Sequence, residues 1–344
     1  MIVVGEKING SIPAAARAIA ERDADWIRGM ARRQAEAGAD FIDVCASVEF
    51  GEPEALRWMI DLVQSVTGIP VSIDSPSAET LVQTYGFCRR PGLFNSVSME
   101  KGKRIDKVFQ IMRENPGWKV IAMLSGDDGI PKCAADRLRV LEDIVKKAEE
   151  HKIPLSRIYI DPIAEAEAYI DPEQEDGPGI SVAAKVVSEI RRRYPALHIT
   201  SAISNISHGL PERKYMNYSF VVLMLACGLD CGILDPLQEG LLAVAGAAER
   251  LLALPKERLW ELAVSVREKG PEGCRLLDSG TGAVSNRYMK LAAVILSMKL
   301  LKSGVRDMKL DERDQDVMGA AYAAAALLGL EEEGSCVEYV DAYK

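Results

Sequence analysis

Eight short apolar runs rich in Val and Ile alternate with longer helical patterns along this 344-residue sequence. A strand-like run and a helix-like pattern recur about every 30 residues, which is typical of parallel strands joined by right-handed helical crossovers. Eight such units within about 250 residues match a (β/α)8 barrel in both number and length. The sequence therefore predicts an α/β protein, a (β/α)8 TIM barrel, with an additional C-terminal helical extension.

The predicted strands are short, and most of them end next to polar residues. In chain order they are IVVG (2–5), FIDVCA (41–46), PVSID (70–74), LFNSVS (93–98), KVIAML (119–124), RIYIDPI (157–163), HITSAIS (198–204) and CGILDP (231–236). The predicted helices cover 24–37, 54–66, 103–115, 135–150, 180–193, 216–227 and 237–252. A doubly wound open sheet is the main alternative. The segment after the first strand, GEKINGSIP, lacks the GxGxxG spacing that would favour it.

The strand and helix period stops near residue 255, so we expect a barrel over 1–254 and a helical extension over 255–344. PKERLWELAVSVREKG, NRYMKLAAVILSMKLLKSG and ERDQDVMGAAYAAAALLGL predict three helices in the extension. The run AAYAAAALLGL (320–330) is too apolar for a solvated helix, and it is shorter than the roughly 20 residues that span a bilayer. We expect the extension to pack on the barrel or on a dimer partner.

Composition and charge exclude several classes of protein. Hydrophobic residues make up 48% and charged residues 27% of the chain, which is ordinary for a globular protein. The net charge is −9, from 42 basic and 51 acidic residues, and it argues against general nucleic-acid binding. The one strong basic run, RRR at 191–193, lies on a predicted amphipathic helix and is best interpreted as a solvated face.

The seven cysteines contain no CxxC pair and are irregularly spaced, so neither a disulfide framework nor a structural zinc site is expected. The N-terminal MIVVGEKING lacks the pattern of a signal peptide, and no apolar run is long enough to cross a membrane. We therefore expect a soluble, cytoplasmic protein without nucleic-acid or membrane partners.

Polar side chains stand at or just after the end of nearly every predicted strand. They are Glu6, Asn9, Asp43, Asp74, Asn95, Ser125, Asp127, Asp128, Asp161, Ser204, Asn205 and Asp235. In a barrel of this kind the active site forms at the carboxyl ends of the strands, so these groups are expected to converge on one pocket. The alternative is that they cap helices or start turns.

Two ligands suit such a ring of side chains. Carboxylates alone would favour a divalent metal. The mixture of carboxylates and amides instead favours a flat heterocycle with adjacent donors and acceptors, such as an aminopyrimidinone ring, whose N–H and NH2 a carboxylate accepts as a pair.

Six motifs in order carry a family resemblance: GEKING at the first strand, IDS (73–75), FNSVS (94–98), YIDPI (159–163), SNIS (204–207) and LACGLDCGILDP (225–236). Together they resemble the pterin-binding methyltransferases over about residues 1–254. The most similar branch is the methyltetrahydrofolate:corrinoid methyltransferases, which are related to the folate domain of methionine synthase and to dihydropteroate synthase. The resemblance implies a homodimeric barrel enzyme that moves a methyl group between N5 of tetrahydrofolate and the cobalt of a corrinoid (cobalamin) held by a partner protein.

The resemblance also assigns residues. It implies that Asp74, Asn95 and Asp161 bind the pterin ring, that Asn205 hydrogen-bonds near N5, and that Ser204 lies beside it. The family usually has Gln where this sequence has His208, which is the second catalytic candidate because imidazole titrates near neutrality. The family also has Asn in a DxN motif where this sequence has Cys45.

Cofactors and alternative functions follow from what the sequence contains. A corrinoid-binding DxHxxG pattern is absent, so the corrinoid is expected to arrive on a partner, and no tightly bound metal is expected. The alternatives are a dihydropteroate synthase-like enzyme, a metal-dependent barrel enzyme and a non-catalytic pterin-binding subunit. The physiological direction of methyl transfer, and whether the pathway forms acetate or breaks down methylated compounds, do not follow from the sequence.

Overall fold

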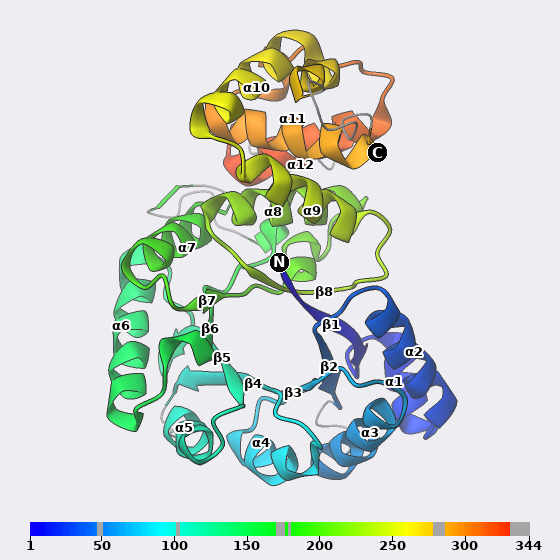
Figure 1. Cartoon of the computed structure of the whole chain (residues 1–344), viewed down its shortest axis with the longest axis vertical. Helices are drawn as coiled ribbons and strands as arrows, with labels where there is room; N and C mark the ends of the chain where they lie inside the picture. The colour runs from blue at the N-terminus through cyan, green and yellow to red at the C-terminus, as the bar shows by residue number, and fades with distance from the viewer. Residues whose placement is uncertain (47–50, 101–103, 170–175, 178–179, 278–285, 331–344) are drawn as a thin grey trace.

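The computed structural model describes residues 1–46, 51–100, 104–169, 176–177, 180–277 and 286–330. Its eight parallel strands follow the order β7-β6-β5-β4-β3-β2-β1-β8, and an isolated parallel bridge between Ala202 and Ile233 joins the two ends of the sheet. The strands are β1 (Ile2–Asn9), β2 (Phe41–Cys45), β3 (Val71–Asp74), β4 (Leu93–Met99), β5 (Lys119–Gly126), β6 (Ile158–Asp161), β7 (His198–Ile199) and β8 (Cys231–Leu234). The predicted (β/α)8 TIM barrel is confirmed (Figure 1).

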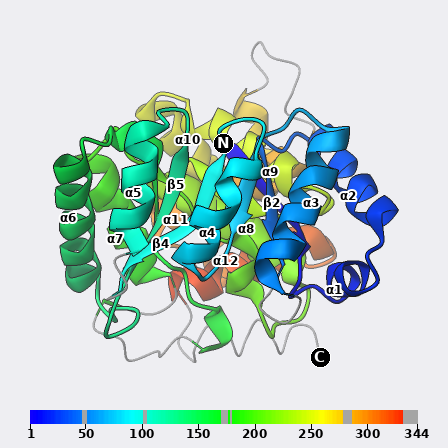
Figure 2. The ribbon, with the colours of Figure 1, turned by 90° about the horizontal axis from the view of Figure 1, so that it is seen from below.

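The helices surround the strands on the outside of the barrel (Figures 1 and 2). They are α1 (Pro13–Ala20), α2 (Ala24–Glu36), α3 (Glu52–Val66), α4 (Ala78–Thr84), α5 (Arg104–Glu114), α6 (Ala134–His151), α7 (Ser181–Arg193), α8 (Arg213–Cys227) and α9 (Leu241–Leu252). Short 3-10 helices include η4 (Glu167–Tyr169) and η5 (Ile203–Ser207). Helices α1 and α4 were not predicted, because about two turns of helix are too short to show an apolar period.

The seventh strand is the main error of the sequence-based prediction. Residues 198–204 were expected as one strand, but regular pairing ends at Ile199 and the chain turns into η5 at Ile203. Thr200 still donates to Ile160 O at 2.9 Å, and Ile233 donates to Ser201 O at 2.9 Å, so the segment still closes the barrel. Within η5, the Ser207 hydroxyl donates to Ser204 O at 3.1 Å.

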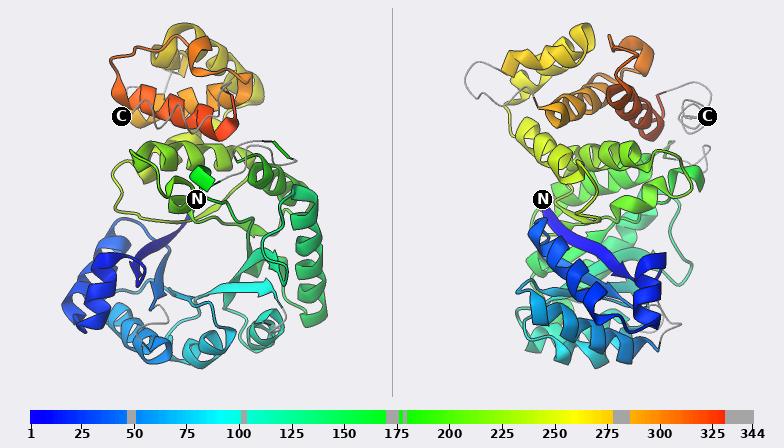
Figure 3. Two further views of the ribbon diagram at one scale, coloured as in Figure 1. Left: turned by 180° about the vertical axis from the view of Figure 1, so that it is seen from behind. Right: turned by 90° about the vertical axis from the view of Figure 1, so that its right-hand side faces the viewer.

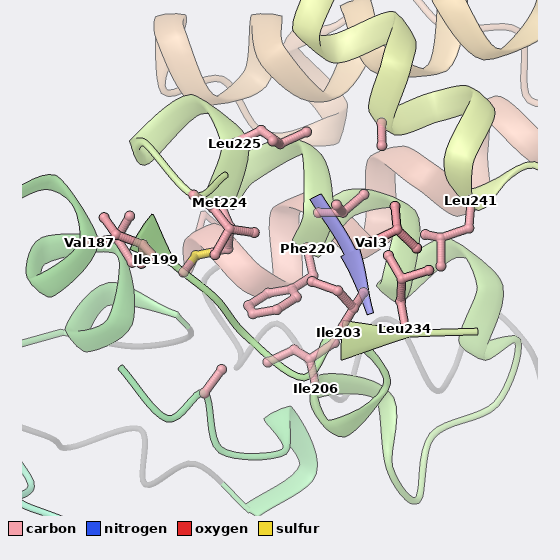
Figure 4. Packing of buried hydrophobic residues seen from close by; sticks show 14 of the residues in the cluster. Val3, Val187, Ile199, Ile203, Ile206, Phe220, Met224, Leu225, Leu234 and Leu241 are labelled. Atoms are coloured by element: carbon pink, nitrogen blue, oxygen red, sulfur yellow. The ribbon is translucent and has the colours of Figure 1, made fainter. Parts of the chain in front are cut away.

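Apolar side chains fill the barrel at the amino ends of its strands, and polar side chains lie toward the carboxyl ends. One buried cluster lies inside the strands and contains Val4, Phe41, Leu93, Ile121, Tyr159, Cys231 and Ile233. Most of these residues stand at or near the amino ends of their strands. A larger cluster packs strands against helices, and Figure 4 shows the part of it around Phe220, Ile203 and Leu234. Polar residues at the carboxyl ends are therefore free to build a site.

Beyond the barrel, α10 (Lys256–Lys269), α11 (Arg287–Leu301) and α12 (Gln315–Leu328) pack outside α8 and α9 (Figures 1 and 3). Helix α8 is buried from Tyr215 to Leu225, because η5 packs on it from the barrel side and α11 and α12 pack on it from outside. An all-round apolar sequence is what such a sandwiched helix requires. The division at residue 254 stays a prediction, and 278–285 and 331–344 of the extension lie outside the described residues.

Candidate active site

Side chains from the neighbouring strands β2, β3 and β4 form a hydrogen-bonded group. The parallel register places Asp43 opposite Ser72 and Asp74 opposite Asn95. Asp43 Oδ1 accepts the Ser72 hydroxyl at 2.5 Å and the Asn95 Nδ2 amide at 3.1 Å. The Cys45 thiol is hydrogen-bonded to Asp74. The register of three neighbouring strands thus brings two predicted ligands, Asp74 and Asn95, to one place.

The two carboxyl groups of this cluster lie close together, and the pKa of each is raised. Burial raises the pKa of Asp43 to about 6, although hydrogen bonds from Ser72 and Asn95 oppose the rise. Burial and the neighbouring Asp43 charge raise the pKa of Asp74 well above its usual value. Two close carboxyl groups do not both ionise easily, so Asp74 keeps its proton more readily than an isolated aspartic acid does. A carboxyl group of this kind accepts hydrogen bonds when ionised and donates one when protonated.

Asp161 ends β6 and is held by a turn. Its Oδ1 accepts the Ile163 amide at 2.8 Å. Burial raises the pKa of Asp161 to about 6, against the lowering effect of that hydrogen bond and of the Arg137 charge. Arg137, only 2% exposed, donates to the Pro162 and Ile163 carbonyls at 2.6 Å each. Arg137 therefore fixes the backbone that follows Asp161.

We call Asp43, Asp74, Asn95 and Asp161 the strand side of the barrel mouth. The opposite edge, which we call the turn side, consists of Glu6, Ser204, Asn205 and His208. The turn-side residues line one cavity of about 760 Å³. Its other lining residues are Lys7, Asn9, Ser11, Ile12, Pro13, Arg213, Lys214, Asn217, Asp235 and Gln238.

The turn side is built on η5 instead of a strand. Asn205 and His208 are exposed, and Arg213 secures the turn by donating to Ser204 O at 2.8 Å and to Ser207 Oγ at 3.0 Å. Ser204 Oγ donates to Glu6 Oε2 at 3.1 Å. Burial is the main cause that raises the pKa of Glu6 to about 7. The stretch from Ser204 to His208 thus presents polar groups to the cavity from a backbone held at both ends.

Some of the polar strand ends have the structural role that was the alternative interpretation. Asn9 Oδ1 accepts the Ser11 amide at 2.9 Å, and Asp235 Oδ1 accepts the Leu237 amide at 2.9 Å, so both start turns. Asp235 also pairs with Lys7 at 2.9 Å. Asp127 and Asp128 are exposed after β5 and do not line this cavity. Asn9 and Asp235 still line the cavity of Ser204 and Asn205, whereas the strand-side residues are not among its lining residues, so only part of the predicted ring converges on this cavity.

Two supporting residues were missed by the sequence-based prediction. Ser72 lies inside an apolar strand run and shows its role only through the register with Asp43. Arg137 had a readable signal, because it stands four residues before Leu141 on the apolar face of α6, where an arginine is unusual. No group of three His, Cys, Asp or Glu side chains suited to a metal ion occurs in the part of the chain that the structure describes.

A (β/α)8 barrel with carboxyl and amide groups gathered at the carboxyl ends of its strands has the architecture of a barrel enzyme. The family model for pterin binding enzymes matches residues 14–235. The chain belongs to this family.

Three proteins illustrate the relationships. The chain is 39% identical to the methylcorrinoid:tetrahydrofolate methyltransferase of Eubacterium limosum over 73% of this chain and 91% of that protein. It is 24% identical to the methionine synthase of Mycobacterium leprae over 68% of this chain and 20% of that protein. A dihydropteroate synthase structure from Xanthomonas albilineans matches with a TM-score of 0.54 and 16% identity, covering 74% of this chain and 94% of that one. The last match shows the shared fold alone.

Proposed function

We propose that this protein is a methyltransferase that moves a methyl group between N5 of tetrahydrofolate and the cobalt of a corrinoid. The observation that carries the proposal is the 39% identity to a methylcorrinoid:tetrahydrofolate methyltransferase across nearly the whole length of that relative. The polar groups at the barrel mouth agree with a pterin substrate, because they combine carboxyl and amide groups.

The two sides of the mouth have different tasks in this proposal. On the strand side, Asp74, Asn95 and Asp161 bind the pterin ring, with Asp43 and Arg137 holding their geometry. On the turn side, Asn205 donates or accepts a hydrogen bond at N5, with Ser204 beside it and His208 near the entrance. An uncharged amide serves both directions, because it stabilises charge developing at N5 during methyl donation and orients the neutral amine during methyl acceptance.

The methyl-transfer assay tests this proposal. The purified protein with tetrahydrofolate should convert methylcob(III)alamin to cob(I)alamin under anaerobic conditions, and with methyltetrahydrofolate it should run the reverse reaction, both followed by visible absorbance. Tight tetrahydrofolate binding without transfer in either direction would instead favour a non-catalytic pterin-binding subunit. Formation of dihydropteroate would favour the synthase, a function that only a likeness in fold supports here.

The corrinoid is a substrate in this proposal and is delivered by a separate corrinoid protein. The name of the relative supports a corrinoid substrate. A cytoplasmic location is proposed as well, supported by the six described cysteines, which form no disulfide with one another. None of the described helices combines the length and the apolar character that crossing a membrane requires.

We also propose that the protein is a homodimer whose interface includes the extension. Trp260 on α10 supports this, because it is 53% exposed and is the exposed large apolar side chain found among the described residues. Deleting the extension would expose the apolar side chains of α8 to water, so a single substitution on α10 tests the dimer interface without disturbing the barrel. Trp260→Glu should produce monomers in sedimentation experiments at a concentration where the wild type is dimeric, and a dimeric variant would contradict the role of α10.

A further inference from the structure

Glu6 is a titratable group in the cavity beside Asn205 that the proposed roles leave unused. It stands on β1, where it is half-buried, and its carboxylate accepts the hydroxyl of Ser204, the residue that precedes Asn205. Glu6, Ser204, Asn205 and His208 line the same cavity. The Ser204 hydroxyl therefore connects the Glu6 carboxylate to the part of the cavity where Asn205 would hydrogen-bond N5.

The proposed reaction needs a group of this kind. When N5 of tetrahydrofolate attacks the methyl carbon, the carbon–cobalt bond breaks and its electron pair stays on cobalt, which goes from Co(III) to Co(I). N5 then carries both a hydrogen and the methyl group with a positive charge. The proton must leave to give neutral methyltetrahydrofolate, and the reverse reaction must return it. An amide such as Asn205 cannot accept that proton.

We propose that Glu6 is the proton acceptor for N5 during methylation of tetrahydrofolate, and the proton donor in the reverse direction, with the Ser204 hydroxyl as the relay. The hydroxyl takes the N5 proton while it passes its own proton to Glu6, so the net products are methyltetrahydrofolate, Co(I) and a protonated Glu6. This inference rests on the proposed methyl transfer and extends it with a residue and a proton path.

The surroundings of Glu6 suit both protonation states near neutral pH. Burial raises the pKa of Glu6 to about 7, and the negative charges of Asp235 and Asp43 act in the same direction. The Ser204 hydrogen bond and the Lys7 charge oppose them, although Lys7 is also paired with Asp235 at 2.9 Å. The other ionisable groups that face this cavity are His208, Arg213 and Lys214. A group that titrates near the working pH exchanges protons efficiently in both directions.

Glu6→Gln tests the assignment, because the amide keeps the shape and the acceptor for Ser204 but cannot take up a proton. At pH 7 we expect kcat to fall roughly 100-fold in both directions, while the Kd of tetrahydrofolate changes less than about threefold. In the wild type, kcat for tetrahydrofolate methylation should rise with pH through about 7, and kcat for methyl donation should fall over the same range. Both slopes should vanish in the variant.

Glu167→Gln is the matched control. Glu167 is also a buried carboxyl group whose pKa burial raises to about 7, but it lies on η4 and is not among the residues that line this cavity. The control should keep both pH slopes. Ser204→Ala gives a second test without changing Glu6, and it should lower kcat while the slopes remain.

The outcomes separate the two proposals. A wild-type protein that binds tetrahydrofolate without methyl transfer would end the proposed function, and this inference with it. If the wild type transfers methyl groups but folded Glu6→Gln keeps its rate and both slopes, the function stands and the role of Glu6 is wrong. If Glu6→Gln does not fold, Ser204→Ala decides, and a wild-type rate in that variant would overturn the relay.

Discussion

The strand side and the turn side of the barrel mouth are built in different ways. On the strand side, Asp43, Asp74 and Asn95 hold one another through the register of neighbouring strands. On the turn side, Asn205 and His208 are exposed on a 3-10 helix that Arg213 secures. One edge is fixed by the sheet, and the other by a short irregular segment.

In the proposed function, this difference separates the residues that bind the pterin ring from those that act at N5. A ring that must be gripped in one orientation needs rigid, preorganised groups, which strands supply. The reacting N5 must be accessible to the large corrinoid, so the residues that contact N5 must lie at an open edge of the barrel. An irregular turn after a strand places residues at such an edge. Substitutions on the strand side should therefore weaken binding, whereas substitutions on the turn side should slow turnover.

Asn205→Ala should have the largest effect and is the most direct test of this division. Losing one preorganised donor at the reacting centre should lower kcat by about 100- to 1,000-fold, while the Kd of tetrahydrofolate changes much less. Stopped-flow methyl transfer and fluorescence titration measure the two quantities. Asn9→Ala is the control, because Asn9 is an amide in the same cavity that is engaged with Ser11. A loss of affinity with unchanged kcat would reverse the assignment.

Asp161→Asn should show the opposite pattern on the strand side. Removing a charged partner of the ring is expected to weaken tetrahydrofolate binding by roughly 10- to 100-fold, with a small change in kcat at saturation. The amide keeps the acceptor for the Ile163 amide, so the turn should survive. A fall in kcat at unchanged affinity would move Asp161 from binding to chemistry.

The same variant should make the free protein more stable at neutral pH. The folded protein raises the pKa of Asp161 to about 6, above the unfolded value, so the native state binds more protons between about pH 4 and 6. Stability is therefore lost as the pH rises through this window. Asp161→Asn should recover roughly 1–3 kcal/mol at pH 7 and little at pH 4, measured by denaturant unfolding.

The control for stability is the exposed Asp128, whose change to Asn should leave the pH dependence of unfolding intact. Equal stability of wild type and Asp161→Asn at both pH values would mean that the buried carboxylate costs nothing. A stabilising change that weakens binding is typical of functional sites.

The sequence predicted where β3 and β6 end, because each is a short apolar run that finishes at an aspartate. Asp74 and Asp161 end these strands, and Asn95 lies within β4 opposite Asp74. Their roles as ring ligands stay predictions. The sequence includes Asp43 among the candidate polar residues at strand ends. Its hydrogen bonds to Ser72 and Asn95 could not be predicted, because they depend on which strands are neighbours in the sheet. Arg137 supports Asp161 from a helix 24 positions away, so no local motif links the two.

The turn side was predicted less well, for a physical reason. HITSAIS has an apolar period that favours a strand, but regular pairing ends at Ile199 and η5 begins at Ile203. An apolar period does not show where strand pairing stops. The cavity itself joins β1, η5, α8 and the residues after β8, which only the closed barrel brings together.

His208→Gln should have the smallest effect, and it separates two possible proton carriers on the turn side. His208 is the other acid–base side chain on the turn side that could carry the N5 proton. If Glu6 takes that proton, replacing His208 with an uncharged glutamine should change kcat less than about threefold at pH 7. The pH slopes of methyl transfer should remain in both directions. Slopes that vanish in His208→Gln but survive in Glu6→Gln would make His208 the carrier, because each variant removes one acid–base side chain and leaves the other in the cavity.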